Sequence, residues 1–174
     1  MLRAILRLDE RLSDWAAGPG NRPGFRAFCR VLTHCGDGIV HLPILAVLFW
    51  TGDAPIKLAV CQTVIATAAG LALMYAIRPL FGRRRPIGDL PREYALLPVL
   101  EKHGFPSGHA LRNFILPPVF GAVWPAAMLP LATYALAVGL ARVALRLHYL
   151  SDIAGGALLG FGIGWISLRL PLPV

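Results

Sequence analysis

Three short stretches of the chain hold the residue types needed to bind a phosphate group and transfer it to a histidine. They read R-x6-RP at residues 78–86, PSGH at residues 106–109 and R-x5-H-x3-D at residues 142–152. Phosphoryl transfer requires cations and hydrogen-bond donors around the phosphate oxygens, a nucleophile in line with the leaving group, and an acid that protonates that group. The three stretches supply each of these parts.

Arginines and a serine-glycine pair could form the phosphate site. Guanidinium groups stay protonated and can bind phosphate oxygens through two parallel hydrogen bonds, and the three motifs contain Arg78, Arg85 and Arg142. Ser107 adds a hydroxyl group, and Gly108 adds a backbone N–H that no side chain obstructs. If a helix begins at this point, its first amide groups add to the anion site.

Two histidines and an aspartate could perform the transfer. His148 and Asp152 are four residues apart, so on a helix they would share one face. The carboxylate would accept the proton of one ring nitrogen and leave the other free to attack phosphorus. His109 would then be the general acid that protonates the leaving oxygen. An isolated H-x3-D is more often a surface pair on a helix, so the functional interpretation depends on the combination of motifs.

The composition indicates a polytopic membrane protein. Of the 174 residues, 56% are hydrophobic and 15% charged, and the mean hydropathy is +0.62, which is too apolar for an ordinary soluble domain. The net charge of +8 is compatible with nucleic-acid binding, but the hydropathy argues against that partner. We therefore expect anionic membrane lipids and a phosphorylated substrate as partners, and no nucleic acid.

The hydrophobic segments predict an all-α bundle of five membrane spans, with a sixth possible if the N-terminal region inserts. Within residues 1–35, arginines on one face and apolar residues on another predict amphipathic helices that lie in the membrane interface. Residues 36–174 would form the catalytic bundle of a single membrane-embedded domain, 1–174. Its expected spans are residues 39–50, 58–77, two helices within 114–141 and residues 149–168.

Prolines and glycines add detail to this bundle. The apolar segment 114–141 is too long for one span, and its four prolines, Pro117, Pro118, Pro125 and Pro130, would divide it, with a hairpin near Pro125. Residues 78–107 form the longest connection. The repeat of Gly156, Gly160 and Gly164 predicts close approach of a neighbouring helix. With these spans, all three motifs lie at the same membrane face.

Taken together and in this order, the motifs resemble those of the type 2 phosphatidic acid phosphatase superfamily, which also includes bacterial acid phosphatases and vanadium haloperoxidases. The family pattern is K-x6-RP, PSGH and SR-x5-H-x3-D, and the resemblance extends over residues 78–152. It implies a phosphatase that needs no metal ion and no other cofactor. It also implies that His148 forms a phosphohistidine, that Asp152 orients it and that His109 is the acid. The implied phosphate-binding residues are Arg78, Arg85, Ser107, Gly108 and Arg142.

The sequence departs from the family pattern at two positions. Arg78 replaces the family's lysine, which keeps the charge but changes its reach and geometry. Ala141 replaces the serine before the arginine of the third motif, so one possible hydroxyl donor is absent. Neither change removes the nucleophile, its carboxylate partner or the acid. We expect activity to persist with an altered substrate preference.

A site between membrane spans favours a phosphate attached to a lipid. Phosphatidate, phosphatidylglycerophosphate and prenyl phosphates or diphosphates all fit, and the sequence does not choose among them. Two other functions could use the same residues: a lipid phosphotransferase, in which an acceptor hydroxyl intercepts the phosphohistidine, and a non-catalytic protein that binds or transports phospholipids. The presence of both histidines and Asp152 argues against simple binding.

The distribution of basic residues bears on orientation in the membrane. With five spans, 15 of the 17 lysines and arginines fall on the active-site face, and only Lys57 and Arg169 lie opposite. The positive-inside rule then favours a site on the cytoplasmic face of a bacterial inner membrane, although bacterial membrane members of the family usually face the periplasm. We expect the cytoplasmic face, because the six N-terminal arginines are not needed for phosphate binding.

The remaining polar residues receive structural interpretations. Arginines near span ends are interpreted as anchors to lipid headgroups, a set that includes Arg83, Arg84 and Arg92. Asp37 follows a glycine and is interpreted as a turn residue or helix cap. The other three histidines have no partner at a recognisable spacing and are assigned structural or interfacial roles: His34, His41 and His103.

Overall fold

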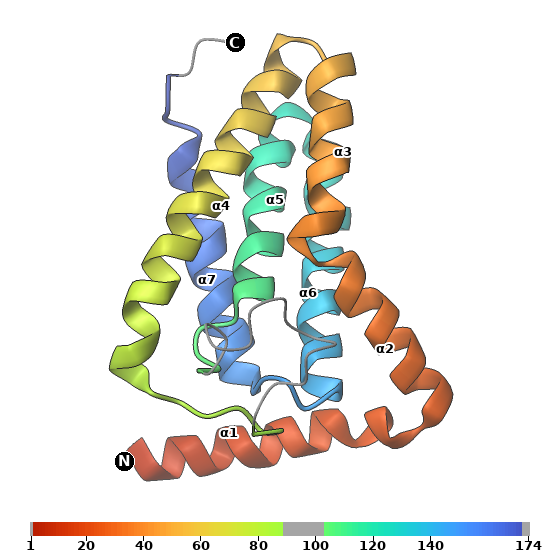
Figure 1. The fold of residues 1–174 in the computed structure, drawn as a ribbon, viewed down its shortest axis with the longest axis vertical. Helices are drawn as coiled ribbons and strands as arrows, with labels where there is room; N and C mark the ends of the chain where they lie inside the picture. The colour runs from red at the N-terminus through yellow and green to blue at the C-terminus, as the bar shows by residue number, and fades with distance from the viewer. Residues whose placement is uncertain (1, 89–102, 172–174) are drawn as a thin grey trace.

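The computed structural model describes residues 2–88 and 103–171. This part of the chain contains seven α-helices and no strand, which confirms the predicted all-α class. In chain order the helices are α1 (Leu2–Ala17), α2 (Pro23–Cys35), α3 (Gly38–Thr51), α4 (Ala54–Phe81), α5 (Gly108–Val123), α6 (Met128–Ala144) and α7 (Leu150–Ser167). Figure 1 shows α3 to α7 as an upright bundle, with α1 lying across its lower end.

Glycines and prolines lie at several helix ends. α1 stops before Gly18, where a short 3-10 helix, η1 (Gly18–Asn21), turns the chain into α2. The segment 36–37 separates α2 from α3, and the two helices meet at a bend of 49°. The hairpin near Pro125 is also confirmed, because α5 ends at Val123 and a second 3-10 helix, η4 (Pro125–Ala127), leads into α6.

Two details of the predicted bundle are wrong. Pro117 and Pro118 lie inside α5 and do not divide it, because both are buried in a helix surrounded by neighbours whose packing outweighs the lost backbone hydrogen bond. The long connection begins later than residue 78, since α4 continues to Phe81 and ends at Gly82. Gly82 has φ of 55°, the left-handed conformation that commonly terminates helices at glycine, and its N–H donates to the Arg78 carbonyl.

Helix α5 forms the centre of the bundle and contacts α4, α6 and α7. Most of its residues are buried, including Leu111, Ile115 and Val119, which join the main hydrophobic core. By contrast, large apolar side chains on the outward faces of other helices are exposed, among them Leu136, Leu158 and Trp165. Apolar surface of this extent is typical of helices that face lipid.

Three of the described helical segments are long and apolar enough to cross a membrane: α4, η4 with α6, and α7. α2 and α3 add a fourth if the bent pair is one span. The predicted five spans correspond to α3 to α7, but α5 has 16 residues and α3 has 14, which at 1.5 Å per residue is short for a bilayer core of about 30 Å. The membrane character of the chain is confirmed, whereas the count of five stays a prediction.

The glycine repeat of α7 lies against the backbone of α5, as predicted. A Cβ atom at Gly156, Gly160 or Gly164 would lie 2.4, 2.2 or 2.9 Å from a carbonyl oxygen of Ser107, Leu111 or Ile115, respectively. Only glycine allows so close an approach. This contact holds the start of α5 against the start of α7.

We predict that Gly160→Ala destabilises the protein by about 1–3 kcal/mol, because the new methyl group overlaps the Leu111 carbonyl oxygen. Gly162 on the same helix is the matched control, since a Cβ there meets nothing within 4 Å. Gly162→Ala should be neutral or slightly stabilising, given the helix preference of alanine. Thermal unfolding in detergent measures both, and equal effects would contradict the close contact between α5 and α7.

Candidate active site

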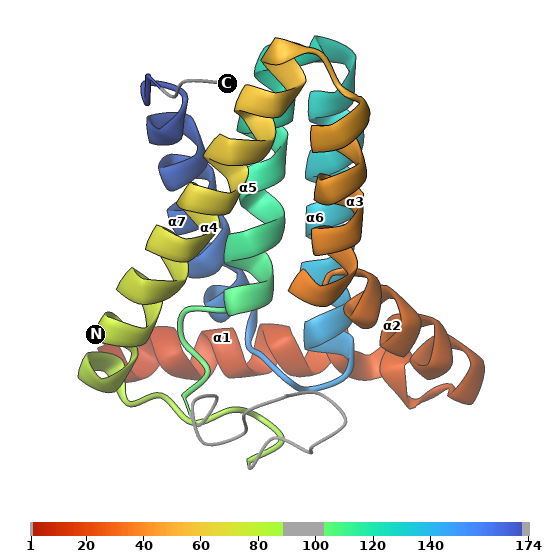
Figure 2. The same cartoon turned by 45° about the horizontal axis from the view of Figure 1, so that its top comes forward.

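The three motifs converge at the lower end of the bundle. Arg78 lies in the last turn of α4 and Arg85 in the segment that follows, PSGH begins α5, and His148 lies between α6 and α7. The two views in Figures 1 and 2 show that these segments come together at the end of the bundle where α1 lies. The predicted site residues are all buried there: Arg78, Arg85, Ser107, Gly108, His109, Arg142, His148 and Asp152.

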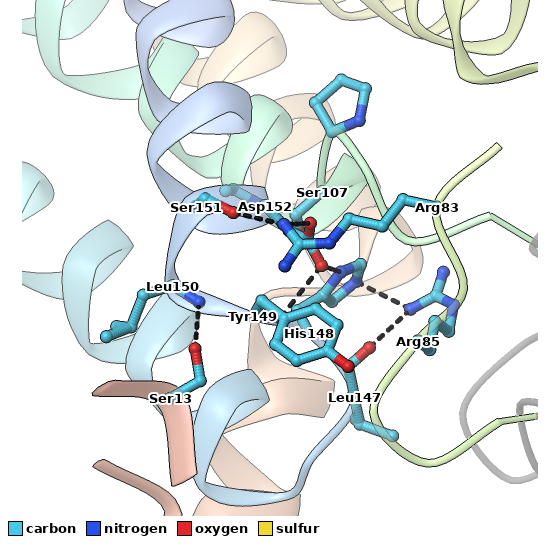
Figure 3. Close-up of polar contacts among 12 residues, drawn as sticks. Ser13, Arg83, Arg85, Ser107, Leu147, His148, Tyr149, Leu150, Ser151 and Asp152 are labelled. Carbon is cyan, nitrogen blue, oxygen red and sulfur yellow. Dashed lines mark hydrogen bonds and ion pairs between the residues drawn. The ribbon is translucent and has the colours of Figure 1, made fainter. Parts of the chain in front are cut away.

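Hydrogen bonds on both sides of the His148 ring define its tautomer (Figure 3). On one side, Nδ1 lies 3.3 Å from Asp152 Oδ2. On the other, Nε2 lies 2.8 Å from Nη1 of Arg85. Because a guanidinium group can only donate, Nε2 must be the acceptor, so the proton of the neutral ring is on Nδ1 and points at Asp152. The lone pair of Nε2 therefore faces the arginine cluster.

The predicted reason for the contact between His148 and Asp152 is wrong. The two residues do not share a helix face, because α7 begins at Leu150 and His148 precedes its N-cap, Tyr149. Asp152 occupies the first turn and folds back, so that Oδ2 accepts the Tyr149 N–H at 2.9 Å as well as facing His148. The carboxylate thus caps the helix and contacts the histidine at the same time.

His109 makes a contact that the sequence analysis missed. Its Nε2 lies 2.7 Å from Asp37 Oδ1 and 3.3 Å from Nη1 of Arg142. The shorter contact assigns the Nε2 proton as a donor to Asp37, which leaves Arg142 as a neighbouring positive charge. Asp37 is the N-cap residue of α3, as interpreted from the sequence, but its side chain makes no hydrogen bond to that helix and contacts His109 instead. Asp37 has glycine neighbours and belongs to no recognisable motif, so no sequence pattern indicated its contact with His109.

Two arginines of the cluster donate hydrogen bonds to backbone carbonyls. Nε and Nη2 of Arg78 lie 3.4 and 3.3 Å from the Pro106 carbonyl oxygen, and Nη1 of Arg85 donates to the Leu147 carbonyl oxygen at 3.1 Å. Gly108 leaves room for this arrangement, since a Cβ there would lie 3.2 Å from the sulfur of Met74 and 3.7 Å from Nη2 of Arg78. Neighbouring motifs thus fix each other's positions.

Ser107 links the second motif to the third. Its side-chain oxygen accepts the Ala110 N–H at 3.4 Å and so caps α5, while its own N–H donates to the Asp152 carbonyl oxygen at 3.0 Å. The α5 N-terminus, with the partial positive charge of its free amides, therefore lies beside Asp152. Ser107 and Gly108 are at the position expected of phosphate-binding residues, at the start of a helix.

Arg83 does not anchor a headgroup as predicted. Its guanidinium Nη1 lies 3.1 Å from Asp152 Oδ1 and also bonds Ser151 Oγ, while Nη2 bonds Asp9 of α1. The group also lies over the Tyr149 ring, 4.0 Å from its centroid. In the structure, Asp9 lies on the same face of α1 as the buried residues Ser13 and Ala17, which follow it at steps of four.

The other residues singled out in the sequence lie outside this cluster. Arg84 is exposed, as expected of an anchor, and Arg92 falls outside the described residues. His34 is bonded to Asp37 Oδ2 at 3.0 Å on the exposed side of that carboxylate. His41 and His103 are partly buried, and neither has a contact to the arginine cluster among the described bonds.

Burial and positive charge lower the pKa of His148. Loss of hydration disfavours the charged imidazolium, and the nearby cations Arg85, Arg142 and Arg78 disfavour it further, so the pKa lies well below the ordinary value of 6.5. The ring is therefore neutral at physiological pH. A neutral ring with a lone pair on Nε2 is the form that can act as a nucleophile.

Comparison with known proteins places the chain in a family. The sequence model of the PAP2 superfamily matches residues 59–173. Decaprenylphosphoryl-5-phosphoribose phosphatase of Mycobacterium tuberculosis is 31% identical over 150 residues, which cover 84% of this chain and 80% of that protein. The Aquifex aeolicus LpxE crystal structure superposes with a TM-score of 0.70 at 27% identity, covering 86% of this chain and 88% of that one.

A second solved structure shares the fold. It is the first transmembrane PAP2 type phosphatidylglycerolphosphate phosphatase from Bacillus subtilis, with a TM-score of 0.75 at 21% identity, covering 95% of this chain and 85% of that one. The family match, the sequence relative and the motifs gathered at one end of an apolar helical bundle agree. The chain therefore belongs to the PAP2 superfamily, and it is an integral membrane phosphatase that acts on lipid phosphates.

Proposed function

We propose that the protein hydrolyses a lipid phosphate through a phosphohistidine formed on His148, without a metal ion. Nε2 of His148 attacks phosphorus while the bond to the leaving oxygen breaks, and His109 gives that oxygen a proton. Water then attacks the phosphohistidine, His109 takes a proton from the water, and inorganic phosphate leaves. The phosphate oxygens are bound by the arginines of the three motifs, Ser107 and the Gly108 N–H.

The orientation of His148 is the observation that carries this proposal. Its Nδ1 proton faces Asp152 and its Nε2 lone pair faces Arg85. As Nε2 bonds to phosphorus, positive charge develops on the ring, and the Asp152 carboxylate stabilises it. A phosphate that binds between Arg85 and Arg142 would lie beside Nε2. Since Arg142 is 3.3 Å from Nε2 of His109, a leaving oxygen beside Arg142 would be close enough to take the Nε2 proton that faces Asp37 in this structure.

A groove beside the site supports a substrate with a long hydrocarbon tail. This groove of about 560 Å³ runs along α3, α5 and α6, and apolar side chains such as Ile44, Phe120 and Leu131 line it. Cys35 lies at its boundary, two residues before the Asp37 that contacts His109. Among the candidate lipids we favour a prenyl-linked phosphate, because the relative at 31% identity is named for a decaprenyl lipid.

The phosphotransferase alternative shares every step up to the phosphohistidine. A hydroxyl-bearing acceptor in place of water would produce a new phosphate ester instead of inorganic phosphate. We favour hydrolysis because the named relative is a phosphatase. Measuring inorganic phosphate released per lipid phosphate consumed distinguishes the two, since a phosphotransferase would give a ratio well below one when an acceptor alcohol is present.

We predict that His148→Ala lowers the turnover rate by about 10³-fold or more, because no other group can form the intermediate. Phosphate release from prenyl phosphates and phosphatidate in detergent measures this. Wild-type protein given labelled substrate and quenched in base should retain label that acid removes, as expected for phosphohistidine. Activity that disappears with EDTA, or a labelled protein after His148→Ala, would contradict the proposal.

The lowered pKa of His148 predicts where activity falls at low pH. The nucleophile is lost only when pH drops through that pKa, so the acid limb of kcat/KM should lie below the ordinary histidine value of 6.5. Arg85→Gln removes a cation that lowers the pKa and should move the limb to higher pH. Both proteins are compared on the same substrate, so ionisation of its phosphate affects the two pH profiles equally and does not contribute to their difference. An unchanged limb in Arg85→Gln would show that another group controls it.

We propose that the site faces the cytoplasm from an inner membrane, because of the predicted excess of basic residues at that face. A single cysteine at the exposed position 84, in a chain whose Cys29, Cys35 and Cys61 are replaced by alanine, provides the test. In intact cells, a thiol reagent that cannot cross the membrane should leave Arg84→Cys unlabelled until the cells are opened. Labelling before lysis would place the site on the opposite face.

A further inference from the structure

Arg83 joins two carboxylates that come from opposite ends of the chain. Its Nη1 lies 3.1 Å from Asp152 Oδ1, and its Nη2 bonds Asp9 Oδ2. The three side chains are largely removed from solvent, with exposed fractions of 17% for Arg83, 11% for Asp9 and 0% for Asp152. A fork of two N–H groups shared between two carboxylates restricts the position of both far more than a single exposed pair would.

Asp9 belongs to the inward face of α1, which is polar. Its Oδ1 accepts the Ser151 N–H at 3.0 Å, and its Oδ2 accepts the Ser151 hydroxyl at 2.6 Å. One turn later, Ser13 Oγ accepts the Leu150 N–H at 2.9 Å (Figure 3). The apolar side of the same helix is turned outward, where Trp15 is 82% exposed. α1 therefore uses its polar residues to bind the first free amides of α7.

The charge state of Asp9 fits this arrangement. Burial alone would raise its pKa, but hydrogen bonds from Ser151 and from Arg83 outweigh that effect and leave the pKa below its ordinary value. Asp9 is therefore ionised at neutral pH and balances the charge of Arg83. Without that balance, the whole positive charge of Arg83 would be directed at Asp152.

We propose that Asp9 and Arg83 are positioning residues for the reaction: through Arg83, Asp9 of the surface helix α1 sets the position of Asp152 and the share of its negative charge that reaches His148. The proposal rests on the phosphohistidine mechanism described above. Asp152 can stabilise a positively charged ring only to the extent that Arg83 does not already neutralise it. Asp9 holds Arg83 on the Oδ1 side of that carboxylate and leaves Oδ2 for His148.

The charged and titratable groups around His148 and Asp152 come from several neighbouring segments. Arg83 and Arg85 belong to the connection after α4, Asp9 belongs to α1, and the remaining neighbours are Arg78 of α4, His109 of α5 and Arg142 of α6. Among these, Asp9 contributes negative charge on the Asp152 side. Its removal therefore makes the surroundings of His148 more positive, and removal of Arg83 makes them less positive.

Two variants that act in opposite directions test the proposal. Asp9→Asn should lower kcat about tenfold with little change in KM, because the phosphate-binding arginines stay in place, and should move the acid limb of the pH profile to lower pH. Arg83→Ala should also lower kcat, but should move the acid limb to higher pH. A residue that merely supports the fold would not shift the two limbs in opposite directions.

Two control variants come from the same helix. Asp14 pairs with Arg146 at the surface, where the two side chains are 63% and 47% exposed, so Asp14→Asn should leave kcat and the pH profile unchanged. Ser13→Ala removes the other contact from α1 to the start of α7 without touching Arg83. It should lower the thermal stability in detergent and leave the acid limb in place.

The outcomes distinguish a failure of this proposal from a failure of the phosphohistidine mechanism on which it rests. If His148→Ala abolishes turnover while Asp9→Asn behaves like Asp14→Asn, the positioning role is overturned and the mechanism stands. If Ser13→Ala shifts the acid limb as Asp9→Asn does, docking of α1 and not the charge of Asp9 is responsible. If His148→Ala remains active, the mechanism itself fails. If Asp9→Asn does not fold, the acid limb of Arg83→Ala provides the test. A shift of that limb to higher pH supports the proposal, and an unchanged limb overturns it.

Discussion

Backbone lies against backbone where α7 crosses α5, and the position of the active site follows from this contact. The three glycines of α7 place no side chain at the crossing, so the carbonyl oxygens of Ser107, Leu111 and Ile115 lie only 2.4, 2.2 and 2.9 Å from where a Cβ atom would be. At its lower end the same contact lets the Ser107 N–H donate to the Asp152 carbonyl. The second and third motifs are thus joined by helix packing and a backbone hydrogen bond, without any contribution from the side chains of the site.

Burial of several guanidinium groups in one place creates the electrostatic character of the site. Backbone carbonyls at Pro106 and Leu147 accept hydrogen bonds from Arg78 and Arg85, so part of the lost hydration is replaced by fixed dipoles. The cluster lowers the pKa of His148, and Asp152 lies on the other side of the ring, where it would stabilise the positive charge that the proposed mechanism places on the ring. A region of concentrated positive charge beside an apolar groove matches a substrate with a phosphate at one end and a hydrocarbon tail at the other.

Besides its predicted position in the membrane interface, α1 contacts the start of α7. Its exposed apolar residues, such as Leu8 and Leu12, fit the predicted interfacial position, while its inward residues cap the helix that carries Asp152. Arg83 connects the two, because its position five residues after Arg78 places it beyond the end of α4 and opposite both carboxylates. Segments distant in sequence thereby contribute to the surroundings of one histidine.

Motif spacing and hydrophobic pattern were sufficient to predict the all-α membrane class, the family and the residues gathered at the site, because both signals are local in the chain. Gly18, Gly36 and Pro125 lie within one turn of the helix ends that they cause, so these ends are also predictable from the sequence alone. Local patterns failed where the conformation or contacts of a residue depend on groups far away in the sequence. Pro117 stays helical because its surroundings are packed, Asp37 contacts His109 across 72 positions, and Arg83 meets Asp9 across 74. The tautomer of His148 likewise depends on Arg85 and Asp152 reaching it from two sides, and only the folded chain brings those three groups together.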